Sequence, residues 1–511
     1  MERTTYDYII AGAGSAGCVL AAELSNSGAQ VLILESGGND NAPTILNPSV
    51  WFYNVGGPLD YHLPLQSSPR IANRTLNMAL GRVLGGGSSI NGMVWGRGMR
   101  RDFDSWAENG AAGCGFDDVL PVFKAQEDWE GGANEWRGAG GPVHVRKPHD
   151  PHQAARAFVA AGHAMGMPVV DDMNGPMQPG IGYINMNIGP DGLRVSAARA
   201  FLHPALIRPN LTLLLNAHVQ NVNFRGNRAT GIRVIVDGTA KDFNAGREVI
   251  LCAGGVGSPK LLMLSGVGDA SALSALDIDV VEHLPGVGKN FQDQILVLGV
   301  VFKYKGKIPE RHPDSNAVEA EAYWSSGFSA VDTDINLVLH ELMATTPEVA
   351  ARFGSPPADS LTLGAALAQP SSRGSVRLVS SKVSDPAIVD GNYYGTDSDL
   401  KATMRAIELC RELGQQPAFR EVVEAELIPG PNASAADLGT LARLGATSFG
   451  HPVGACKIGV DDMAVVDPQL RVRGIEGLRV ADSSVMPRIP TGPTNAPTIM
   501  VAGKAARMIL A

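Results

Sequence analysis

The chain has 511 residues, 44% of them hydrophobic and 18% charged, with a formal net charge of −9. This length predicts two domains in a globular protein, and the acidic balance argues against nucleic acid as a partner, because phosphate binding needs a basic surface. No apolar run approaches the roughly 18 residues of a membrane span, and the five scattered cysteines show no metal-ligand spacing and favour a reducing, cytoplasmic location.

The beginning of the chain predicts a strand, a helix and a second strand joined by a glycine-rich turn. We expect the first strand at Tyr6–Ile10, the helix at Cys18–Leu24 and the second strand at Val31–Leu34, which ends in Glu35. The turn before the helix contains Gly12, Ala13, Gly14, Ser15, Ala16 and Gly17. Its G-x-G-x-x-G spacing allows a tight turn, close approach of a diphosphate to the backbone, and close packing of the helix. The unit is therefore predicted to bind a dinucleotide.

Glu35 narrows the choice of cofactor. An acid at the end of the second strand accepts hydrogen bonds from a ribose diol and repels a 2′-phosphate, so NADP is disfavoured. The pattern alone does not distinguish NAD from FAD. The alternative, a purely structural glycine turn, leaves the matching strand, helix and acid unexplained.

A second glycine-rich segment spans Gly81–Trp95 and follows a loop-rich region at residues 36–80. It contains three consecutive glycines and then Ser88 and Ser89, a composition that we expect to form neither a strand nor a helix. Such a segment brings bare backbone amides to a ligand, whereas the alternative is a flexible linker. The basic residues within Arg97–Arg101 are expected on a solvated surface.

The remaining pattern predicts two sheets. Helices are expected at Asp102–Glu108 and Phe116–Lys124, and residues 126–195 look irregular. Strands are then expected at Leu211–Leu215, Val219–Phe224, Gly231–Val236 and Glu248–Cys252, followed by a helix at Ser258–Leu264. A separate sheet is expected within residues 296–445, with strands at Val331–Leu342 and Leu361–Ala368 and a helix at Asp397–Leu413. A strand at Leu478–Asp482 and a helix at Thr498–Leu510 complete the pattern.

Two late loops carry candidate catalytic side chains. His451 lies in a glycine- and proline-rich loop and not on an apolar helix face, which favours a catalytic role over a structural one. Asn495 lies in a proline-rich loop before the last helix, a place where asparagine commonly caps a helix.

With these motifs, the chain resembles the glucose–methanol–choline (GMC) oxidoreductases, an FAD-dependent family, over nearly its whole length. The resemblance is carried by Gly12–Gly17 with Glu35, and by Gly81–Val94, Gly254–Leu262, His451–Gly454 and Asn495–Thr498. It implies an α/β fold with a Rossmann-like FAD-binding domain and a second, substrate-binding domain built on an antiparallel sheet. We expect the FAD-binding domain mainly within residues 1–295, with part of the substrate domain inserted around 150–195. The substrate-binding domain is expected at 296–450, and 451–511 returns to the FAD domain with the catalytic pair.

The resemblance also implies roles for individual residues. His451 and Asn495 correspond to the family's catalytic pair. The positions that correspond to cofactor contacts are Gly12, Gly14, Ser15, Ala16, Gly17, Glu35, Ser36, Gly85, Gly86, Gly87, Ser89, Asn91, Gly92, Met93, Val94, Val219, Ala481 and Asp482. Ile90 stands where some members attach the flavin through a histidine, so we expect non-covalent FAD.

The implied reaction is oxidation of an alcohol to an aldehyde or ketone. A neutral His451 takes the hydroxyl proton, Asn495 holds the same oxygen, and a hydride passes to flavin N5. The residue before the catalytic histidine is often aromatic in the family and is Gly450 here, so either the pocket is wider or another ring, such as that of Phe449, fills it. The alternatives are hydroxynitrile lyase or photodecarboxylase chemistry on the same scaffold, and a non-catalytic flavin-binding protein. Retention of both candidate catalytic residues argues against them.

The expected substrate is a neutral primary alcohol, aliphatic or aryl. Residues 296–345 are expected to form much of the pocket wall, and their aromatic residues are Phe302, Tyr304, Tyr323, Trp324 and Phe328. These do not suggest an aromatic cage for a quaternary ammonium group, which weakens choline as the substrate. The electron acceptor is either O2 or a quinone-like or protein acceptor, and we slightly favour a dehydrogenase.

Overall fold

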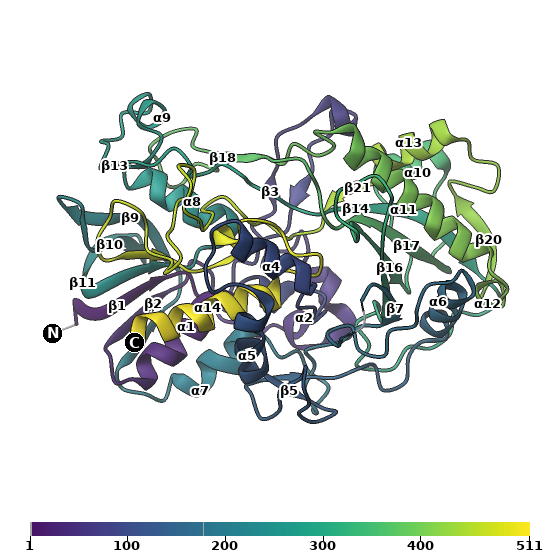
Figure 1. Ribbon diagram of the computed structural model, residues 1–511, viewed down its shortest axis with the longest axis horizontal. Helices are drawn as coiled ribbons and strands as arrows, with labels where there is room; N and C mark the ends of the chain where they lie inside the picture. Colours follow the sequence, from purple (N-terminus) through teal and green to yellow (C-terminus); the bar gives the residue numbers. More distant parts are fainter. Residues whose placement is uncertain (1–2, 177) are drawn as a thin grey trace.

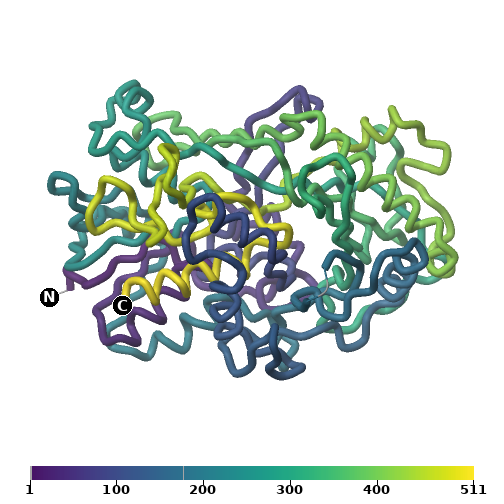
Figure 2. Tube along the Cα trace, in the orientation of Figure 1, coloured from purple at the N-terminus to yellow at the C-terminus, as the bar shows by residue number. Residues whose placement is uncertain are grey.

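The computed structural model describes residues 3–176 and 178–511, and its elements are arranged around two large sheets (Figure 1). The first sheet occupies the left of the view and the second sheet the right. The first and last parts of the chain meet beside the first sheet, so both termini lie at the same end of the molecule (Figure 2).

The first sheet has seven strands in the order β8-β2-β1-β11-β10-β9, with β22 paired to β11. These strands are β1 (Thr5–Ala11), β2 (Val31–Leu34), β8 (Leu211–Leu214), β9 (Ala217–Arg225), β10 (Arg228–Val236), β11 (Thr239–Leu251) and β22 (Leu478–Val480). The pairs β8–β2, β2–β1, β1–β11 and β11–β22 are parallel, and β9 and β10 extend the sheet by antiparallel pairing. The α/β class is therefore confirmed.

Two helices from opposite ends of the sequence pack together beside the first sheet. They are α1 (Ser15–Asn26), which follows β1, and α14 (Asn495–Leu510). Nine residues of α1 are buried, so its sequence has no solvent-facing stripe of the usual width. A third helix, α8 (Gly254–Leu264), follows β11 and contacts β9.

The second sheet also has seven strands, in the order β20-β14-β17-β16-β15-β7, with β21 paired to β14. These strands are β7 (Gly180–Tyr183), β14 (Ile295–Tyr304), β15 (Ala320–Trp324), β16 (Ile335–His340), β17 (Ser360–Leu367), β20 (Val423–Ile428) and β21 (Ala446–Ser448). All of their pairings are antiparallel, as the resemblance predicted.

Helices cover the outer face of the second sheet. Helix α11 (Asp397–Gln415) contacts β14, β16 and β17, and a Cβ added to its Gly414 would lie 2.0 Å from the ring of Phe302. Because side chains alternate along a strand, Ala366 lies on the opposite face of β17 from Leu361, the partner of Phe302. A register shift between Leu298 and Val300 in β14 places Leu296 opposite Ala366, on that same face. We call this other face, which carries Leu296, Ala366 and Asn336, the inner face.

The other helices are α2 (Pro43–Leu46), α3 (Gly87–Ile90), α4 (Arg100–Glu108), α5 (Phe116–Gln126), α6 (Gln153–Ala164), α7 (His203–Ala205), α9 (Ala270–Ser274), α10 (Pro347–Phe353), α12 (Pro417–Arg420) and α13 (Ala435–Leu444). Short helical turns of other types are η1 (Pro48–Asn54), η2 (Pro69–Ile71), η3 (Ala198–Leu202) and η4 (Ser483–Val485). The short strands are β3 (Leu63–Pro64), β4 (Asn77–Met78), β5 (Glu127–Trp129), β6 (Val143–Val145), β12 (Val267–Gly268), β13 (Glu282–His283), β18 (Ser375–Arg377) and β19 (Ile388–Asp390).

The structure corrects three local predictions. Residues 126–195 are not irregular throughout, because α6 buries an alanine-rich face that includes Phe158. Gly87–Ile90 forms one helical turn where neither helix nor strand was expected. Arg97 is buried against Glu127 and is not part of a solvated surface, although Arg100 and Arg101 are solvated and paired with acids.

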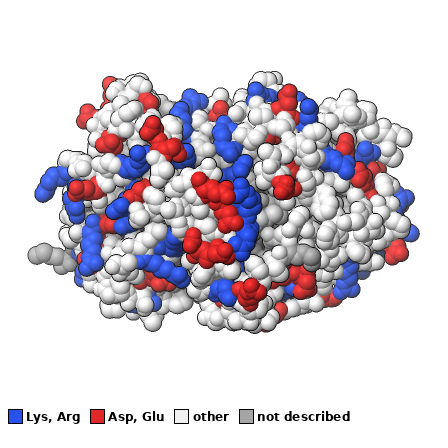
Figure 3. Space-filling view, in the orientation of Figure 1, with Lys and Arg blue, Asp and Glu red and all other residues white. Residues whose placement is uncertain are grey.

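Charge is mixed over the surface. On the face shown in Figure 3, basic and acidic side chains alternate without a broad patch of one sign. Within the described ranges, every helix is too short or too polar to cross a membrane.

Candidate functional site

The turn between β1 and α1 can only be made by glycine at two positions. Gly12 has a φ of +106°, and a Cβ there would lie 2.4 Å from the carbonyl oxygen of Cys252. A Cβ on Gly17 would lie 1.9 Å from the carbonyl oxygen of Gly12. The first-turn N–H groups of α1 have no acceptor within the helix, so this bare turn presents donors and a partial positive charge to an anion.

The second glycine-rich segment closes the same cradle. Gly86 approaches the first turn so closely that its Cβ would lie 2.8 Å from the Cα of Gly14. Gly85 is held there by its N–H, which donates to the Ala13 carbonyl at 2.8 Å. The segment Gly85–Gly87 thus lies beside the first glycine turn, although the two segments are about 70 residues apart in the chain. Together their bare backbone fits a bound diphosphate.

Glu35 lies at the end of β2, next to this cradle. Its carboxylate accepts the Ala13 N–H at 3.1 Å and the Gly37 N–H at 2.8 Å, and burial raises its pKa. The Ser36 hydroxyl donates to Glu35 at 3.3 Å and hydrogen-bonds with the Tyr61 hydroxyl. This end of the sheet has the acid and hydroxyl groups that suit a ribose diol.

Two neighbours of Glu35 were missed by sequence reasoning. Tyr61 lies against Ser36, and the Arg82 guanidinium lies 5.8 Å from the centre of the Tyr61 ring. Tyr61 belongs to the loop-rich region at 36–80, which has no periodic signal that could single it out.

The predicted residue Val219 lies near Glu35 through strand β9. Val219 is two residues after Ala217, whose N–H donates to the Glu35 carbonyl at 2.8 Å, so β9 passes this end of the site.

The serines after the glycines face the protein and not the cradle. The Ser88 hydroxyl donates to the Gly85 carbonyl at 2.6 Å, and the Ser89 hydroxyl donates to the Leu84 carbonyl at 2.7 Å. What Ser89 can offer a cofactor is therefore its backbone. These two bonds stabilise the single turn of α3.

Asn91, Gly92 and Met93 form the next part of this segment. The Asn91 side-chain carbonyl accepts the Met93 N–H at 3.0 Å and an Arg194 guanidinium N–H at 2.7 Å. Met93 has a φ of +58°, and Val94 bridges to Met186. Arg194 is fully buried, which lowers its pKa to about 9, and it also donates to the Ser88 carbonyl. Arg194 was not found from the sequence because nothing local marks it.

The end of β22 is fastened to the start of α8 by Asp482. Its carboxylate accepts the Gly254 N–H at 2.8 Å and the Ser258 hydroxyl at 2.5 Å, and Ser484 donates to it twice. Burial raises the pKa of Asp482. Ala481 is joined to the sheet by its N–H, which donates to Leu251 at 3.0 Å. Asp482 is thus satisfied by the protein, so the surface offered to a cofactor here is backbone.

Asn495 is the first residue of α14, and the structure places it beside the first glycine turn. Its side-chain carbonyl accepts the Ser15 hydroxyl at 2.7 Å, and Ser15 is the first residue of α1. Two helix N-termini therefore meet here, which doubles the set of free N–H donors available to an anion. Within the described residues no hydrogen bond joins Asn495 to His451.

Asp293 holds the loop that carries His451 through hydrogen bonds. This buried carboxylate accepts the His451 N–H at 2.8 Å, the Ser448 hydroxyl at 2.6 Å and the Tyr393 hydroxyl at 2.5 Å. Burial raises the pKa of Asp293, and the four donors that surround it oppose that rise. The Asp293 contacts fix the backbone of His451 relative to the first residue of β14.

The His451 ring is oriented by Gln294. Its Nδ1 lies 2.6 Å from the Gln294 side-chain oxygen. The Gln294 amide nitrogen donates to the carbonyls of Ala368, Pro490 and Thr491, so the oxygen has to face His451. Nδ1 therefore carries the proton, and Nε2 keeps its lone pair. Burial lowers the pKa of His451 to about 4, so the ring is neutral at pH 7.

The residue directly before His451 is Gly450, but an aromatic ring still lies next to His451, and it belongs to Phe449. Gly450 has a φ of +75°, a conformation that favours glycine, and the Phe449 ring stacks on His451 with a centroid distance of 4.8 Å. The neighbouring ring thus comes from Phe449, and Gly450 makes the turn that allows this.

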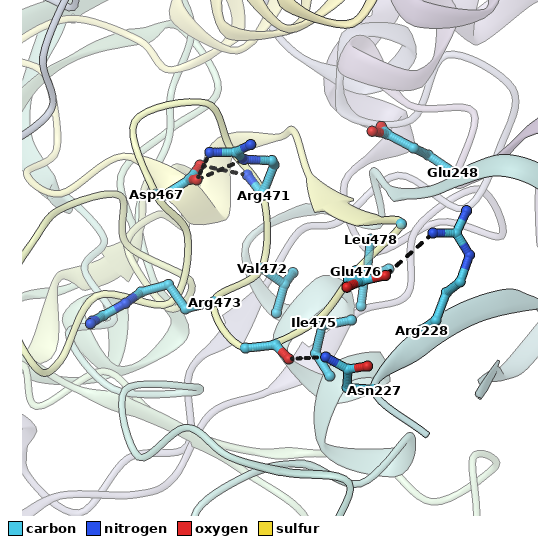
Figure 4. A pocket seen from close by; sticks show the side chains of 12 residues that line it. Asn227, Arg228, Glu248, Asp467, Arg471, Val472, Arg473, Ile475, Glu476 and Leu478 are labelled. Carbon is cyan, nitrogen blue, oxygen red and sulfur yellow. Dashed lines mark hydrogen bonds and ion pairs between the residues drawn. The ribbon is translucent and has the colours of Figure 1, made fainter. Parts of the chain in front are cut away.

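A hollow of about 560 Å³ lies away from these groups. It is lined by Arg228, Glu248 and residues of the segment 467–478, and is shown in Figure 4. Two ion pairs join residues that line it, Arg471 with Asp467 and Arg228 with Glu476. The hollow includes Gly477, which precedes β22, whereas the cradle lies at the carboxyl ends of the parallel strands, where such sheets bind ligands.

Comparison with known protein families gives two matches. Family models described as GMC oxidoreductase match residues 6–296 and residues 370–502. Together they span most of the chain, including both glycine-rich segments, His451 and Asn495.

Curated relatives match almost end to end. The chain is 38% identical over 532 residues to an oxygen-dependent choline dehydrogenase of Brucella suis, covering 99% of this chain and 95% of the relative. It is also 38% identical over 538 residues to a protein of the same name from Vibrio vulnificus, covering 99% and 94%.

Solved structures share the same fold. The crystal structure of pyridoxine 4-oxidase from Mesorbium loti matches with a TM-score of 0.92 and 32% identity, covering 98% of both chains. A formate oxidase from Aspergillus oryzae RIB40 matches with a TM-score of 0.90 and 25% identity, covering 100% of this chain and 98% of the other.

Proposed function

The chain belongs to the GMC oxidoreductase family and is an FAD-dependent oxidoreductase acting on CH–OH donors, and from this premise we propose that His451 is the general base of its alcohol oxidation. The observation that carries the proposal is the contact between His451 and Gln294. It leaves Nε2 as the only ring nitrogen free to accept a proton.

The assignment of cofactor contacts follows from the cradle. The backbone of the first glycine turn, of Gly85–Gly87 and of the start of α14 would hold the diphosphate, and Glu35 with Ser36 would hold the ribose. Asn91, Met93 and Val94 would line the flavin ring, and bound FAD supplies the two-electron acceptor that oxidation of a C–H bond requires. Ile90 is buried in α3 and offers no group for a covalent link, which supports non-covalent FAD.

His451 would act before or during cleavage of the C–H bond. An alcohol hydroxyl has a pKa far above 7, so its carbon becomes a good hydrogen donor only as the oxygen loses its proton. The neutral His451 accepts that proton at Nε2, while Gln294 keeps the opposite nitrogen protonated. Stacking on Phe449 and the bond from the His451 N–H to Asp293 hold the ring in place.

We assign Asn495 primarily to the cofactor side. Its bond to Ser15 turns its carbonyl towards the glycine cradle, and its amide nitrogen stays available to a ligand there. A role beside His451, as the family pair implies, requires the same side chain to reach the alcohol oxygen.

The proposed domain division keeps the FAD-binding part at 1–295 and 451–511 and the substrate-binding part at 296–450, with an insertion around 150–195. Support comes from strand pairing: β7 joins the second sheet, while β22 joins the first. The alcohol and the acceptor, O2 or a quinone-like or protein acceptor, remain to be assigned by experiment. The relatives named choline dehydrogenase and pyridoxine 4-oxidase make cationic and heteroaromatic alcohols the first ones to examine.

The test is anaerobic mixing of the holoenzyme with aryl, aliphatic, sugar and amino alcohols. We expect at least one class to bleach the oxidised flavin absorbance, and reoxidation by air or by a quinone to identify the acceptor. Bleaching by none of them would contradict alcohol oxidation. Acid precipitation of the same sample should release a yellow supernatant, and colour retained in the pellet would contradict non-covalent FAD.

A further inference from the structure

Asp102 is a buried carboxylate on helix α4 that accepts more hydrogen bonds than its helix requires. It is 5% exposed and is the third residue of α4, where its Oδ2 accepts the Met99 N–H at 2.8 Å and so caps the helix. Asp118 has the same position in α5 and caps Gly115 in the same way, but it is exposed to solvent. Helix capping therefore explains one hydrogen bond of Asp102 and leaves its burial unexplained.

The other hydrogen bonds of Asp102 come from Thr491 and Gln369, two buried residues that are distant in the chain. The Thr491 N–H donates to Oδ2 at 2.7 Å, and the Thr491 hydroxyl donates to Oδ1 at 2.9 Å. The Gln369 amide nitrogen donates to Oδ1 at 3.1 Å. Together with the Met99 N–H, four donors surround this carboxylate, and each of its oxygens accepts two of them.

The negative charge of Asp102 is needed for this complete set of contacts. Burial raises its pKa to about 6, and the donors of Thr491 and Met99 and the charge of Arg488 oppose that rise. The carboxylate is therefore ionised at pH 7, and both of its oxygens act only as acceptors. A side-chain amide in its place would turn an NH2 group towards one pair of the surrounding donors.

Thr491 connects Asp102 to the residue that orients His451. The Gln294 amide nitrogen donates to the carbonyl of Thr491 at 3.2 Å and to that of Pro490 at 3.0 Å. The oxygen of the same amide lies 2.6 Å from Nδ1 of His451. Asp102 is thus joined to the His451 ring through two residues, and every step is a hydrogen bond.

The loop that contains Thr491 packs directly on the start of α4. Gly98 has a φ of +87°, and a Cβ there would lie 2.8 Å from Asp102 Oδ2 and 3.0 Å from the Cβ of Pro490. A Cβ on Gly492 would lie 3.1 Å from the Gly98 nitrogen. Because the two segments fit this closely, Asp102 fixes where the carbonyls of residues 490 and 491 lie.

The position of these carbonyls decides which end of the Gln294 amide faces His451. The carbonyls of Ala368, Pro490 and Thr491 surround the amide nitrogen, so an inverted amide would place its oxygen against all three. Without the two loop carbonyls, only Ala368 opposes inversion. An inverted amide donates to Nδ1, so Nε2 becomes the protonated nitrogen and cannot accept a proton.

We propose that Asp102 is a positioning residue for His451, and that it acts through Thr491 and Gln294 to hold the ring in the tautomer whose Nε2 is free to accept the alcohol proton. The proposal rests on the proposed function of His451 as the base. The loop that Asp102 holds leads directly into α14, so the same contacts connect α4 with the start of the helix that carries Asn495.

The test changes the two partners of the first step. Asp102→Asn removes the charge and turns an NH2 group towards donors. Thr491→Val replaces the hydroxyl with a methyl group of the same shape, and Thr491→Ser is the conservative variant that keeps the hydroxyl. The matched control is Asp118→Asn, which makes the same change at the same capping position of α5, on the surface.

Two measurements are made on each holoenzyme. Stopped-flow mixing with an alcohol under anaerobic conditions gives the limiting rate of flavin reduction and the apparent Kd for the alcohol. NMR spectra of protein labelled with ¹⁵N at histidine show which ring nitrogen carries the proton. The signals of His451 are identified as those that are absent from His451→Ala.

We expect Asp102→Asn to lower the limiting rate by about 10- to 100-fold, the effect of a small misplacement remote from the reacting atoms. Thr491→Val should lower it by about 2- to 12-fold, the usual worth of one hydrogen bond. In both variants the Nε2 signal should shift towards that of a protonated nitrogen, while the Kd changes little. Thr491→Ser and Asp118→Asn should behave like the wild type.

The two measurements separate this proposal from the function on which it rests. A wild-type tautomer in Asp102→Asn would overturn the proposal, whether or not the rate falls, because a fall would then reflect a structural role only. If Asp102→Asn does not retain FAD, Thr491→Val decides by the same measurements. A shifted tautomer with a wild-type rate would support the positioning role of Asp102 and contradict only His451 as the base.

Discussion

The proposed cofactor side of the site and its proposed substrate side are built by different means. The cofactor side is made of backbone, since Gly12, Gly17 and Gly86 lie where a Cβ would meet another main-chain atom. The proposed substrate side is made of side chains, with Gln294 orienting the ring of His451 and Phe449 stacking on it. A backbone site tolerates almost no change at its glycines, whereas a side-chain site can change its specificity while the fold persists.

The largest effect is expected from filling the backbone cradle. In Gly17→Ala the new Cβ would lie 1.9 Å from the Gly12 carbonyl oxygen, so the turn has to shift. We expect FAD affinity to fall by roughly 10-fold or more, as for an overpacked core. The measurement is the ratio of flavin to protein absorbance after purification and dialysis.

Gly439→Ala is the control, because the nearest atom to its Cβ, in α13, is 3.8 Å away. Normal FAD content in both variants would show that the first turn is not where the diphosphate binds.

A change at Gln294 tests the orientation of the base. In Gln294→Glu a carboxylate faces Nδ1 of His451, which stabilises the imidazolium and raises the pKa of the ring from about 4. Protonated His451 cannot accept a proton, so the acid limb of the flavin-reduction rate should move to higher pH, by about 1 to 3 units. Stopped-flow reduction from pH 5 to 9 measures this limb.

Gln294→Leu removes the acceptor without adding charge, and it should slow reduction without moving the limb upwards. An identical pH profile in Gln294→Glu and the wild type would mean that another group accepts the proton.

A smaller effect is expected at Asn495, and it distinguishes a role of this residue in FAD binding from a role beside His451. If its bond to Ser15 defines its role, Asn495→Ala should weaken FAD binding by about 2- to 12-fold, the usual worth of one hydrogen bond, and Ser15→Ala should do the same. The double variant should lose little more than either single variant. A large fall in the reduction rate with unchanged FAD binding would instead place Asn495 beside His451.

Sequence alone could predict the glycine cradle because the residues that form it are required by local backbone geometry. The first strand, its helix, the second strand and Glu35 all fall where expected, since a turn that excludes a Cβ leaves glycines in the sequence. His451 was also singled out, because glycine and proline surround it, and its catalytic role stays a prediction. The two-sheet architecture followed from the family resemblance.

The side chains around His451 could not be predicted in the same way. Gln294 matters only because it meets His451 and the loop at 490–491, which are far from it in the chain, and no local pattern records such contacts. Phe302, expected in the pocket wall, instead packs towards α11. Helix α6 was missed because its alanine-rich stretch is surrounded by glycine- and proline-rich loops.

The most direct test of the central claim is the rate of anaerobic flavin reduction in His451→Ala. The variant should be loaded with FAD to the same content as the wild type and mixed at pH 7 with the best alcohol of the panel. We expect reduction to slow by about 10²- to 10⁴-fold, the usual contribution of a general base. Reduction within a few-fold of the wild-type rate, with FAD bound, would contradict His451 as the group that takes the alcohol proton.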